Sequence, residues 1–133
     1  GILIGIGTLE ADDPLLTVRE WGGPDPQPIV LDSKQRIPAD SKVCRENNRK
    51  PWVLSNSKLE NEQINYEQIV VGSDKRGRVD LELAMEAIYA RGIKTLMVEG
   101  GADVISYIPT PLSIAVTIAS NEASLANSHF VWS

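Results

Sequence analysis

The chain has 133 residues, of which 42% are hydrophobic and 23% are charged, so a single globular domain is expected. Its 18 acidic residues outnumber its 13 basic residues, and the net charge of −5 argues against a general binder of nucleic acid or of anionic membranes. One cysteine and one histidine exclude an internal disulfide and leave too few ligands for a zinc site.

The order of apolar runs and turn signals predicts an α/β sheet. A helix is expected from Asp80 to Arg91, because its apolar residues recur at helical spacing and Asp80 can cap its start. This helix joins two apolar strands, which is typical of an α/β protein. A short helix is expected after Gly100–Gly101, and residues 120–133 have no firm pattern. Strands are expected at Gly1–Ile6, Pro28–Ser33, Pro51–Ser55, Gln68–Gly72, Ile93–Glu99 and Ser113–Ala119.

Charge is distributed unevenly along the chain. The segment Lys34–Lys50 has six basic and two acidic residues, hence +4, whereas the first 20 residues have one Arg and four acids, hence −3. The basic segment is therefore a candidate for contacts with phosphate, although the whole chain is acidic.

The pair Gly100–Gly101 follows an expected strand and precedes an expected helix. Glycines there allow a ligand to approach the backbone, and the first N–H groups of the helix favour a phosphate. The alternative is a plain strand-to-helix turn, which the pair by itself favours.

A second glycine-rich strand end is Gly5–Thr8. The dinucleotide-binding fingerprint needs a further glycine where Glu10 stands, so this is not the Rossmann pattern. Either the glycines let a flat ligand lie against the backbone or they serve tight internal packing, and packing is the simpler interpretation.

Four acidic or basic residues are candidates for chemistry. Asp12 and Asp13 could form a turn, bind a ribose hydroxyl or act as acid or base, and the turn is the commonest role of such a pair. Arg19 could hold a phosphate with its forked guanidinium, or simply be exposed. Glu99 ends an apolar strand, where ligands bind in α/β sheets.

Nucleophilic catalysis is not favoured. The single histidine, His129, lies in the segment without pattern, so Ser-His-Asp and Cys-His arrangements are not expected. Cys44 lies in the basic segment, which could lower its pKa, but an incidental thiol is the preferred interpretation.

In their order and spacing, these stretches resemble the riboflavin-biosynthesis reductases, a family of stand-alone fungal and archaeal enzymes that is similar to the C-terminal domain of bacterial RibD. The resemblance runs from Gly1 to about Ala119. The residues that carry it are Gly5–Arg19, Pro28–Lys34, Arg36–Pro38, Asp40–Lys42, Gly77–Leu81 and Leu96–Ala102.

The resemblance implies a dihydrofolate-reductase-like fold, a homodimer and NADPH-dependent reduction of a ribosylaminopyrimidine 5′-phosphate to its ribitylamino form. No metal is implied, and the zinc-deaminase motif is absent, which favours the stand-alone type. By match to the family, the cofactor positions are Thr8, Asp12, Ser33, Val71, Gly100, Gly101, Ala102, Asp103 and Val104. The substrate positions are Leu16, Arg19 and Glu99, with Arg19 near the phosphate and Glu99 as the catalytic candidate.

The resemblance also implies that residues 1–133 are a reductase domain incomplete at both ends. The family has a further strand and helix before Gly1, and after Ala119 it continues differently from this chain. Two alternatives stay open: a reductase of this fold with another substrate, and a non-catalytic nucleotide-binding fragment. No membrane segment or targeting peptide is recognised, and cytosol is the expected location.

Overall fold

A computed structural model of the chain describes residues 1–17, 25–58, 65–99, 114–119 and 128–131. For residues 115–119 and 128–131 only the backbone is described. Three helices are found in these ranges: α1 (Ile6–Asp12), α2 (Lys42–Arg45) and α3 (Leu81–Ala90). The strands are β1 (Ile2–Gly5), β2 (Pro28–Leu31), β3 (Trp52–Ser55), β4 (Glu67–Val70), β5 (Thr95–Glu99), β6 (Ala115–Ala119) and β7 (Ser128–Val131).

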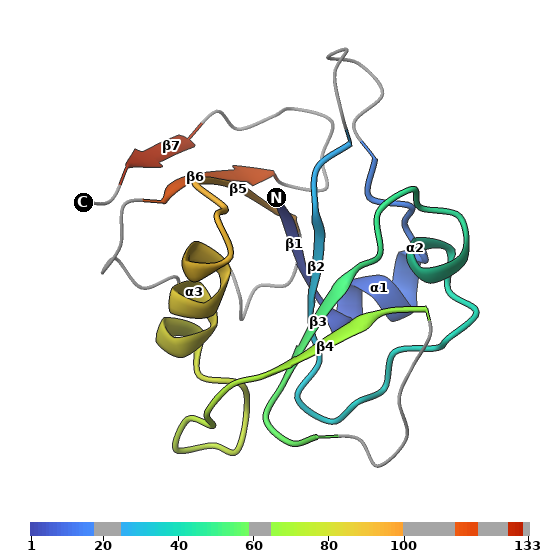
Figure 1. Cartoon of the computed structure of the whole chain (residues 1–133), viewed down its shortest axis with the longest axis horizontal. Helices are drawn as coiled ribbons and strands as arrows, with labels where there is room; N and C mark the ends of the chain where they lie inside the picture. Colours follow the sequence, from blue (N-terminus) through green and yellow to red (C-terminus); the bar gives the residue numbers. More distant parts are fainter. Residues whose placement is uncertain (18–24, 59–64, 100–113, 120–127, 132–133) are drawn as a thin grey trace.

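All seven strands form one sheet in the order β4-β3-β2-β1-β5-β6-β7 (Figure 1). Every neighbouring pair is parallel except β6 and β7. The chain moves from β1 outward to β4 and then crosses back to β5 on the other side of β1. The predicted α/β class is therefore confirmed.

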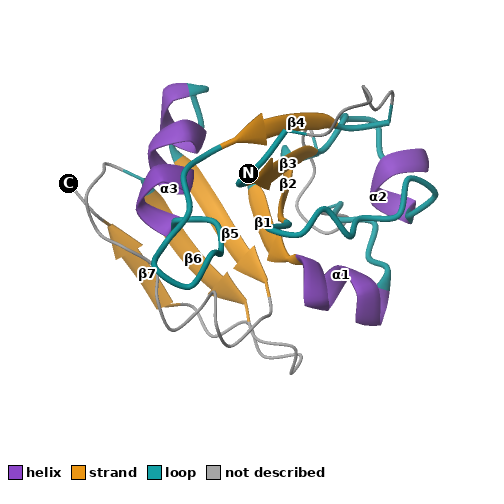
Figure 2. Ribbon diagram, turned by 90° about the horizontal axis from the view of Figure 1, so that it is seen from below, coloured by secondary structure: helices purple, strands orange, loops and turns teal. Residues whose placement is uncertain are grey.

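Helices cover both faces of the sheet, with α3 on one side and α1 and α2 on the other (Figure 2). Side chains alternate between the two faces because successive strand residues point in opposite directions. The core under α3 includes Leu3, Leu54, Ile88 and Val98. The core on the opposite face includes Ile2, Ile4, Leu9, Leu16, Val30, Ile37, Val43, Val53 and Tyr66.

The helix predicted at Asp80–Arg91 is found as α3, with Asp80 as its cap. The Asp80 carboxylate accepts the Leu83 N–H at 3.1 Å, which satisfies one of the unpaired donors of the first turn. Within the described ranges, no helix is long and apolar enough to cross a membrane.

Several sequence predictions differ from the structure. The strand expected at Gly1–Ile6 ends at Gly5, because Ile6 already begins α1. A strand, β7, lies within the segment 120–133, where no pattern was recognised. Its four residues are too few to show an alternation in the sequence. The helix expected after Gly100–Gly101 lies outside the described residues.

Candidate functional site at the carboxyl edge of the sheet

The carboxyl ends of β1, β2 and β5 lie side by side. In the strand register, Ile4 pairs with Glu99 and Gly5 pairs with Leu31. The strand order reverses between β1 and β5, which is the position where parallel α/β sheets bind ligands. The first turn of α1, which carries Thr8, begins directly after β1. It therefore lies at the same edge of the sheet as Glu99, the last residue of β5.

Glu99 is half-buried, and its side chain belongs to the face of the sheet that α1 covers. Met97, two residues earlier, packs against the core on that face, and alternate strand residues share a face. Burial raises the pKa of the Glu99 carboxyl above its ordinary value of 4.5. A carboxyl with this environment keeps a proton to higher pH than an exposed glutamate, as a general acid requires.

The first turn of α1 is open at Gly7. A Cβ built on Gly7 has no atom of another described residue within 4 Å, so packing against the described part of the chain does not require glycine there. Thr8 is half-buried on the same helix, and Asp12 is exposed at its end. Tight packing, the simpler interpretation of Gly5–Thr8, therefore does not hold for Gly7.

The acidic pair divides into two different environments. Asp13 has a left-handed backbone with φ of 43°, and its N–H donates to the Leu9 carbonyl at 2.9 Å. Its carboxylate accepts the Lys42 N–H at 3.0 Å, which ties the end of α1 to the start of α2. Asp13 thus has the turn-forming role, while the side chain of Asp12 faces solvent.

Ser33 lies at the end of β2, where the preceding residue organises the loop. The buried Asp32 carboxylate accepts the N–H groups of Arg36 and Ile37, each at 2.8 Å. The Ser33 hydroxyl oxygen accepts the Val79 N–H at 2.8 Å. Asp32 is not among the candidate residues predicted from the sequence, although an aspartate that follows a strand and precedes a turn is a signal for such a loop.

Val71 follows β4 and packs partly buried against the α3 core. Its N–H donates to the Ser55 carbonyl at 2.8 Å, so its backbone continues the sheet edge. Val71 and Ser33 are therefore both at the carboxyl edge, on the side of β1 opposite to Glu99.

Leu16 has a left-handed backbone with φ of 59° and is 4% exposed within the core on the α1 face. Such a backbone conformation is unfavourable for leucine, and it persists only where the surrounding structure holds the residue in place. Packing of the Leu16 side chain in this core holds the chain just after α1 against the sheet. The remaining candidates, Arg19, Gly100, Gly101, Ala102, Asp103 and Val104, lie outside the described residues.

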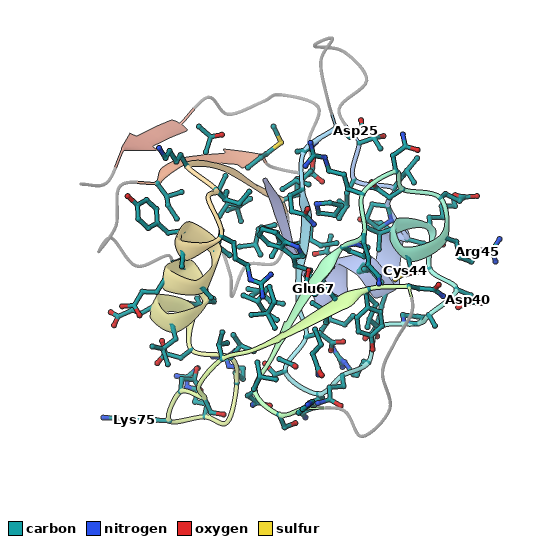
Figure 3. All side chains as sticks on the ribbon, in the orientation of Figure 1. Asp25, Asp40, Cys44, Arg45, Glu67 and Lys75 are labelled. Atoms are coloured by element: carbon teal, nitrogen blue, oxygen red, sulfur yellow. The ribbon has the colours of Figure 1, made fainter. Side chains whose placement is uncertain are left out.

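Cys44 on α2 is half-buried rather than activated by its basic surroundings. Burial raises the pKa of its thiol, and the carboxylates of Asp13 and of Asp40, which lies near Cys44 in Figure 3, act in the same direction. Among the described residues, no group of three His, Cys, Asp or Glu side chains is placed to hold a metal ion.

The sheet order, the helices on both faces and the polar strand ends define an α/β protein whose carboxyl edge is the candidate ligand site. The model of the RibD C-terminal domain family matches residues 1–108, and the chain belongs to this family. The fold is shared with the riboflavin biosynthesis reductase Rib7 of Saccharomyces cerevisiae, with a TM-score of 0.67 and 29% identity over 100% of this chain and 63% of that one. This is the dihydrofolate-reductase-like fold that the resemblance implies.

Curated relatives are named as 2,5-diamino-6-ribosylamino-4(3H)-pyrimidinone 5′-phosphate reductases. The protein from Aquifex aeolicus is 34% identical over 110 residues, which are 78% of this chain and 48% of the relative. The protein from Archaeoglobus fulgidus is 33% identical over 116 residues, which are 79% of this chain and 53% of the relative. The chain thus spans about half the length of the curated relatives it matches.

Proposed function

We propose that this chain forms the reductase domain, residues 1–133, of an enzyme that reduces 2,5-diamino-6-ribosylamino-4(3H)-pyrimidinone 5′-phosphate to the ribitylamino form with NADPH. The observation that carries the proposal is the family match over residues 1–108, which includes every candidate site residue. The names of the relatives support the substrate and the reaction.

The carboxyl edge fits a nicotinamide dinucleotide in its chemistry. Gly7 leaves the backbone of α1 open, while Thr8 and Ser33 offer hydroxyl groups near the ends of β1 and β2. Thr8, Asp12, Ser33, Val71 and Gly100–Val104 would hold NADPH, which supplies the hydride when bound. The protein then has to align the two reactants, and no nucleophile is required.

Glu99 has the environment of a proton donor for this reaction. The ribosylamine opens to an imine, the carbon C1′ accepts the hydride, and the nitrogen accepts a proton, so that the C=N bond becomes CH–NH. The raised pKa of the half-buried Glu99 favours the protonated carboxyl that can hydrogen-bond to this nitrogen. Arg19, with Leu16 as the buried anchor of its segment, is proposed to hold the 5′-phosphate.

The test is NADPH consumption on addition of the ribosylaminopyrimidine phosphate, in its non-deaminated and deaminated forms. We expect turnover with the non-deaminated form and a loss of about 100-fold in Glu99→Gln. Lys94→Gln, an exposed change at the amino end of β5, is the control. Turnover of dihydrofolate instead would indicate another substrate, and binding of NADPH without any turnover would indicate a non-catalytic protein.

Two finer expectations accompany the proposal: assembly as a homodimer and a cytosolic location. Sedimentation analysis of the purified chain tests the first, and fractionation of the source cells tests the second. A monomer that turns over the substrate would contradict the homodimer but would agree with the proposed activity.

A further inference from the structure

The segment 13–17, which follows α1, contains two unfavourable backbone conformations. Asp13 and Leu16 have positive φ angles of 43° and 59°, although neither residue is glycine. No helix or strand includes residues 13–17, so repeating backbone hydrogen bonds do not hold this segment. A residue other than glycine keeps a left-handed backbone only where neighbouring groups hold it. Contacts from elsewhere in the fold must therefore hold Leu16 in its conformation.

The side chain of Asn47, which follows α2, holds the peptide unit in front of Leu16. Its amide nitrogen donates to the Leu15 carbonyl at 2.7 Å, and this hydrogen bond is partly buried. The Leu15 carbonyl and the Leu16 N–H belong to one planar peptide unit. Because rotation of this unit changes φ of Leu16, the bond from Asn47 opposes a return of Leu16 to the commoner backbone regions.

Asn47 is itself held in one orientation by a second hydrogen bond. The Arg49 N–H donates to its side-chain oxygen at 2.9 Å. A side-chain amide has one accepting end and one donating end, and these two bonds use each end in the required sense. A turned amide would place its oxygen against the Leu15 carbonyl and its NH2 group against the Arg49 N–H. The side chain is therefore fixed with its donor toward Leu15.

Two further contacts hold the same segment against α2. The Lys42 N–H donates to the Asp13 carboxylate at 3.0 Å. The buried Leu16 side chain packs in a core that includes Val43 of α2, and α2 lies beside α1 in both ribbon views (Figures 1 and 2). Of these contacts, the one from Asn47 acts directly on the peptide unit before Leu16.

The described substrate positions of the proposed function, Leu16 and Glu99, belong to the same face of the sheet. Leu16 packs with Ile4 in the core on the α1 face, and Ile4 is paired with Glu99 between β1 and β5. Met97 packs against that core and shares a face with Glu99, since alternate strand residues point the same way. The chain after α1 thus passes Leu16 on the face to which the Glu99 carboxyl belongs.

We propose that Asn47 is a positioning residue of the substrate site, because its bond to the Leu15 carbonyl holds the backbone at Leu16 in the conformation that binds the pyrimidine phosphate. The inference rests on the function proposed above, which assigns Leu16 and Arg19 to the substrate. Arg19 follows Leu16 by three residues, so the segment that carries its guanidinium starts from the backbone that Asn47 holds. Asn47 acts through this backbone and takes no part in the transfer of hydride or proton.

The test measures the Kd for the pyrimidine phosphate, the Kd for NADPH and kcat in Asn47→Ala, which removes the amide. We expect the affinity for the pyrimidine phosphate to fall roughly fivefold, with kcat and the Kd for NADPH within about twofold of the wild type. Asn47→Asp still accepts the Arg49 N–H but places an oxygen against the Leu15 carbonyl, so it should lose at least as much affinity. Asn48→Ala and Asn48→Asp are the matched controls, because the exposed Asn48 amide lies 3.4 Å from an Asp25 carboxylate oxygen instead.

Unchanged affinity for the pyrimidine phosphate in both Asn47 variants would overturn the inference. Equal losses of affinity for the pyrimidine phosphate and for NADPH would also overturn it, as would the same losses in the Asn48 variants, because both results indicate a general structural role. A wild type that binds the pyrimidine phosphate but does not consume NADPH contradicts only the proposed reaction, and a selective loss in Asn47→Ala would still support the inference. A wild type that does not bind the pyrimidine phosphate contradicts both.

Turnover by the wild type, together with full substrate affinity in the Asn47 variants, contradicts the inference and leaves the proposed function in place. The two proposals therefore fail on different measurements.

Discussion

Ser33 and Val79 join the end of β2 to the start of α3, because the Ser33 hydroxyl oxygen accepts the Val79 N–H at 2.8 Å. In Ser33→Ala the partly buried Val79 N–H loses its hydrogen-bond acceptor. We expect the free energy of unfolding to fall by about 1 kcal/mol, and the Val79 amide to exchange faster. Urea unfolding and amide hydrogen exchange measure the two effects.

Ser33→Thr keeps the hydroxyl and is the matched control. It should restore most of the stability that Ser33→Ala loses. If Ser33→Ala unfolds at the same urea concentration as the wild type and its Val79 amide is equally protected, the bond does not hold the loop Ser73–Val79 in place.

Ionisation of Glu99 should lower the free energy of unfolding as the pH rises. Burial raises its pKa above 4.5, so folding favours the neutral form, and the stability this gives is lost as pH rises through the raised pKa. Glu99→Gln does not titrate. Its free energy of unfolding should therefore increase relative to that of the wild type above pH 4.5, by less than about 1 kcal/mol because the group is half-exposed.

Thermal unfolding of both proteins across this pH range measures the difference. Glu86→Gln, which removes a charge from the exposed face of α3, controls for the change in net charge. A difference between Glu99→Gln and the wild type that stays constant with pH would show that the environment of Glu99 does not alter its titration.

Strands β1 to β6 were predictable because each falls in a short apolar run between turn signals, and α3 because its helical spacing and its cap Asp80 agree. The order of the strands was not, since β1 pairs with both β2 and β5 through contacts distant in sequence. β7 was missed because four residues paired only with β6 carry no local signal.

For the site, the position of Glu99 at the end of an apolar strand was sufficient to place it at the carboxyl edge. The contacts of Ser33 were out of reach, since its partner Val79 is 46 residues further along the chain. For Cys44 the preferred interpretation, an incidental thiol, agrees with the structure. Its basic sequence neighbours left a lowered pKa as the alternative, whereas burial in the folded chain raises the pKa.

Gly7 should be replaceable for the fold but not for the ligand. Because a Cβ on Gly7 meets no atom of the described residues within 4 Å and alanine favours helix, Gly7→Ala should stabilise the protein by about 0.5–1 kcal/mol. NADPH binding should weaken, since the new methyl group lies where we propose that the cofactor approaches α1. Thermal unfolding and NADPH fluorescence titration measure the two effects.

Gly72→Ala is the contrasting variant, because its Cβ would lie 2.5 Å from Leu83 Cδ1. Since the exposed end of the Leu83 side chain has to turn aside, Gly72→Ala should not show the gain in stability expected for Gly7→Ala. Unchanged NADPH affinity in a stabilised Gly7→Ala protein would show that the open first turn of α1 does not serve the cofactor.

Arg91, at the end of α3, contacts the first residues of β3 and β4. Its Nη1 lies 2.8 Å from the Glu67 carboxylate, and its guanidinium carbon lies 5.3 Å from the centre of the Trp52 ring. Each contact is exposed and worth less than about 1 kcal/mol, so Arg91→Ala should lose about 1 kcal/mol in total.

Urea unfolding of Arg91→Ala, Glu67→Gln and the double variant separates the ion pair from the aromatic contact. High salt should weaken only the former. A coupling energy equal to the whole loss in Arg91→Ala would mean that Trp52 contributes nothing to holding α3.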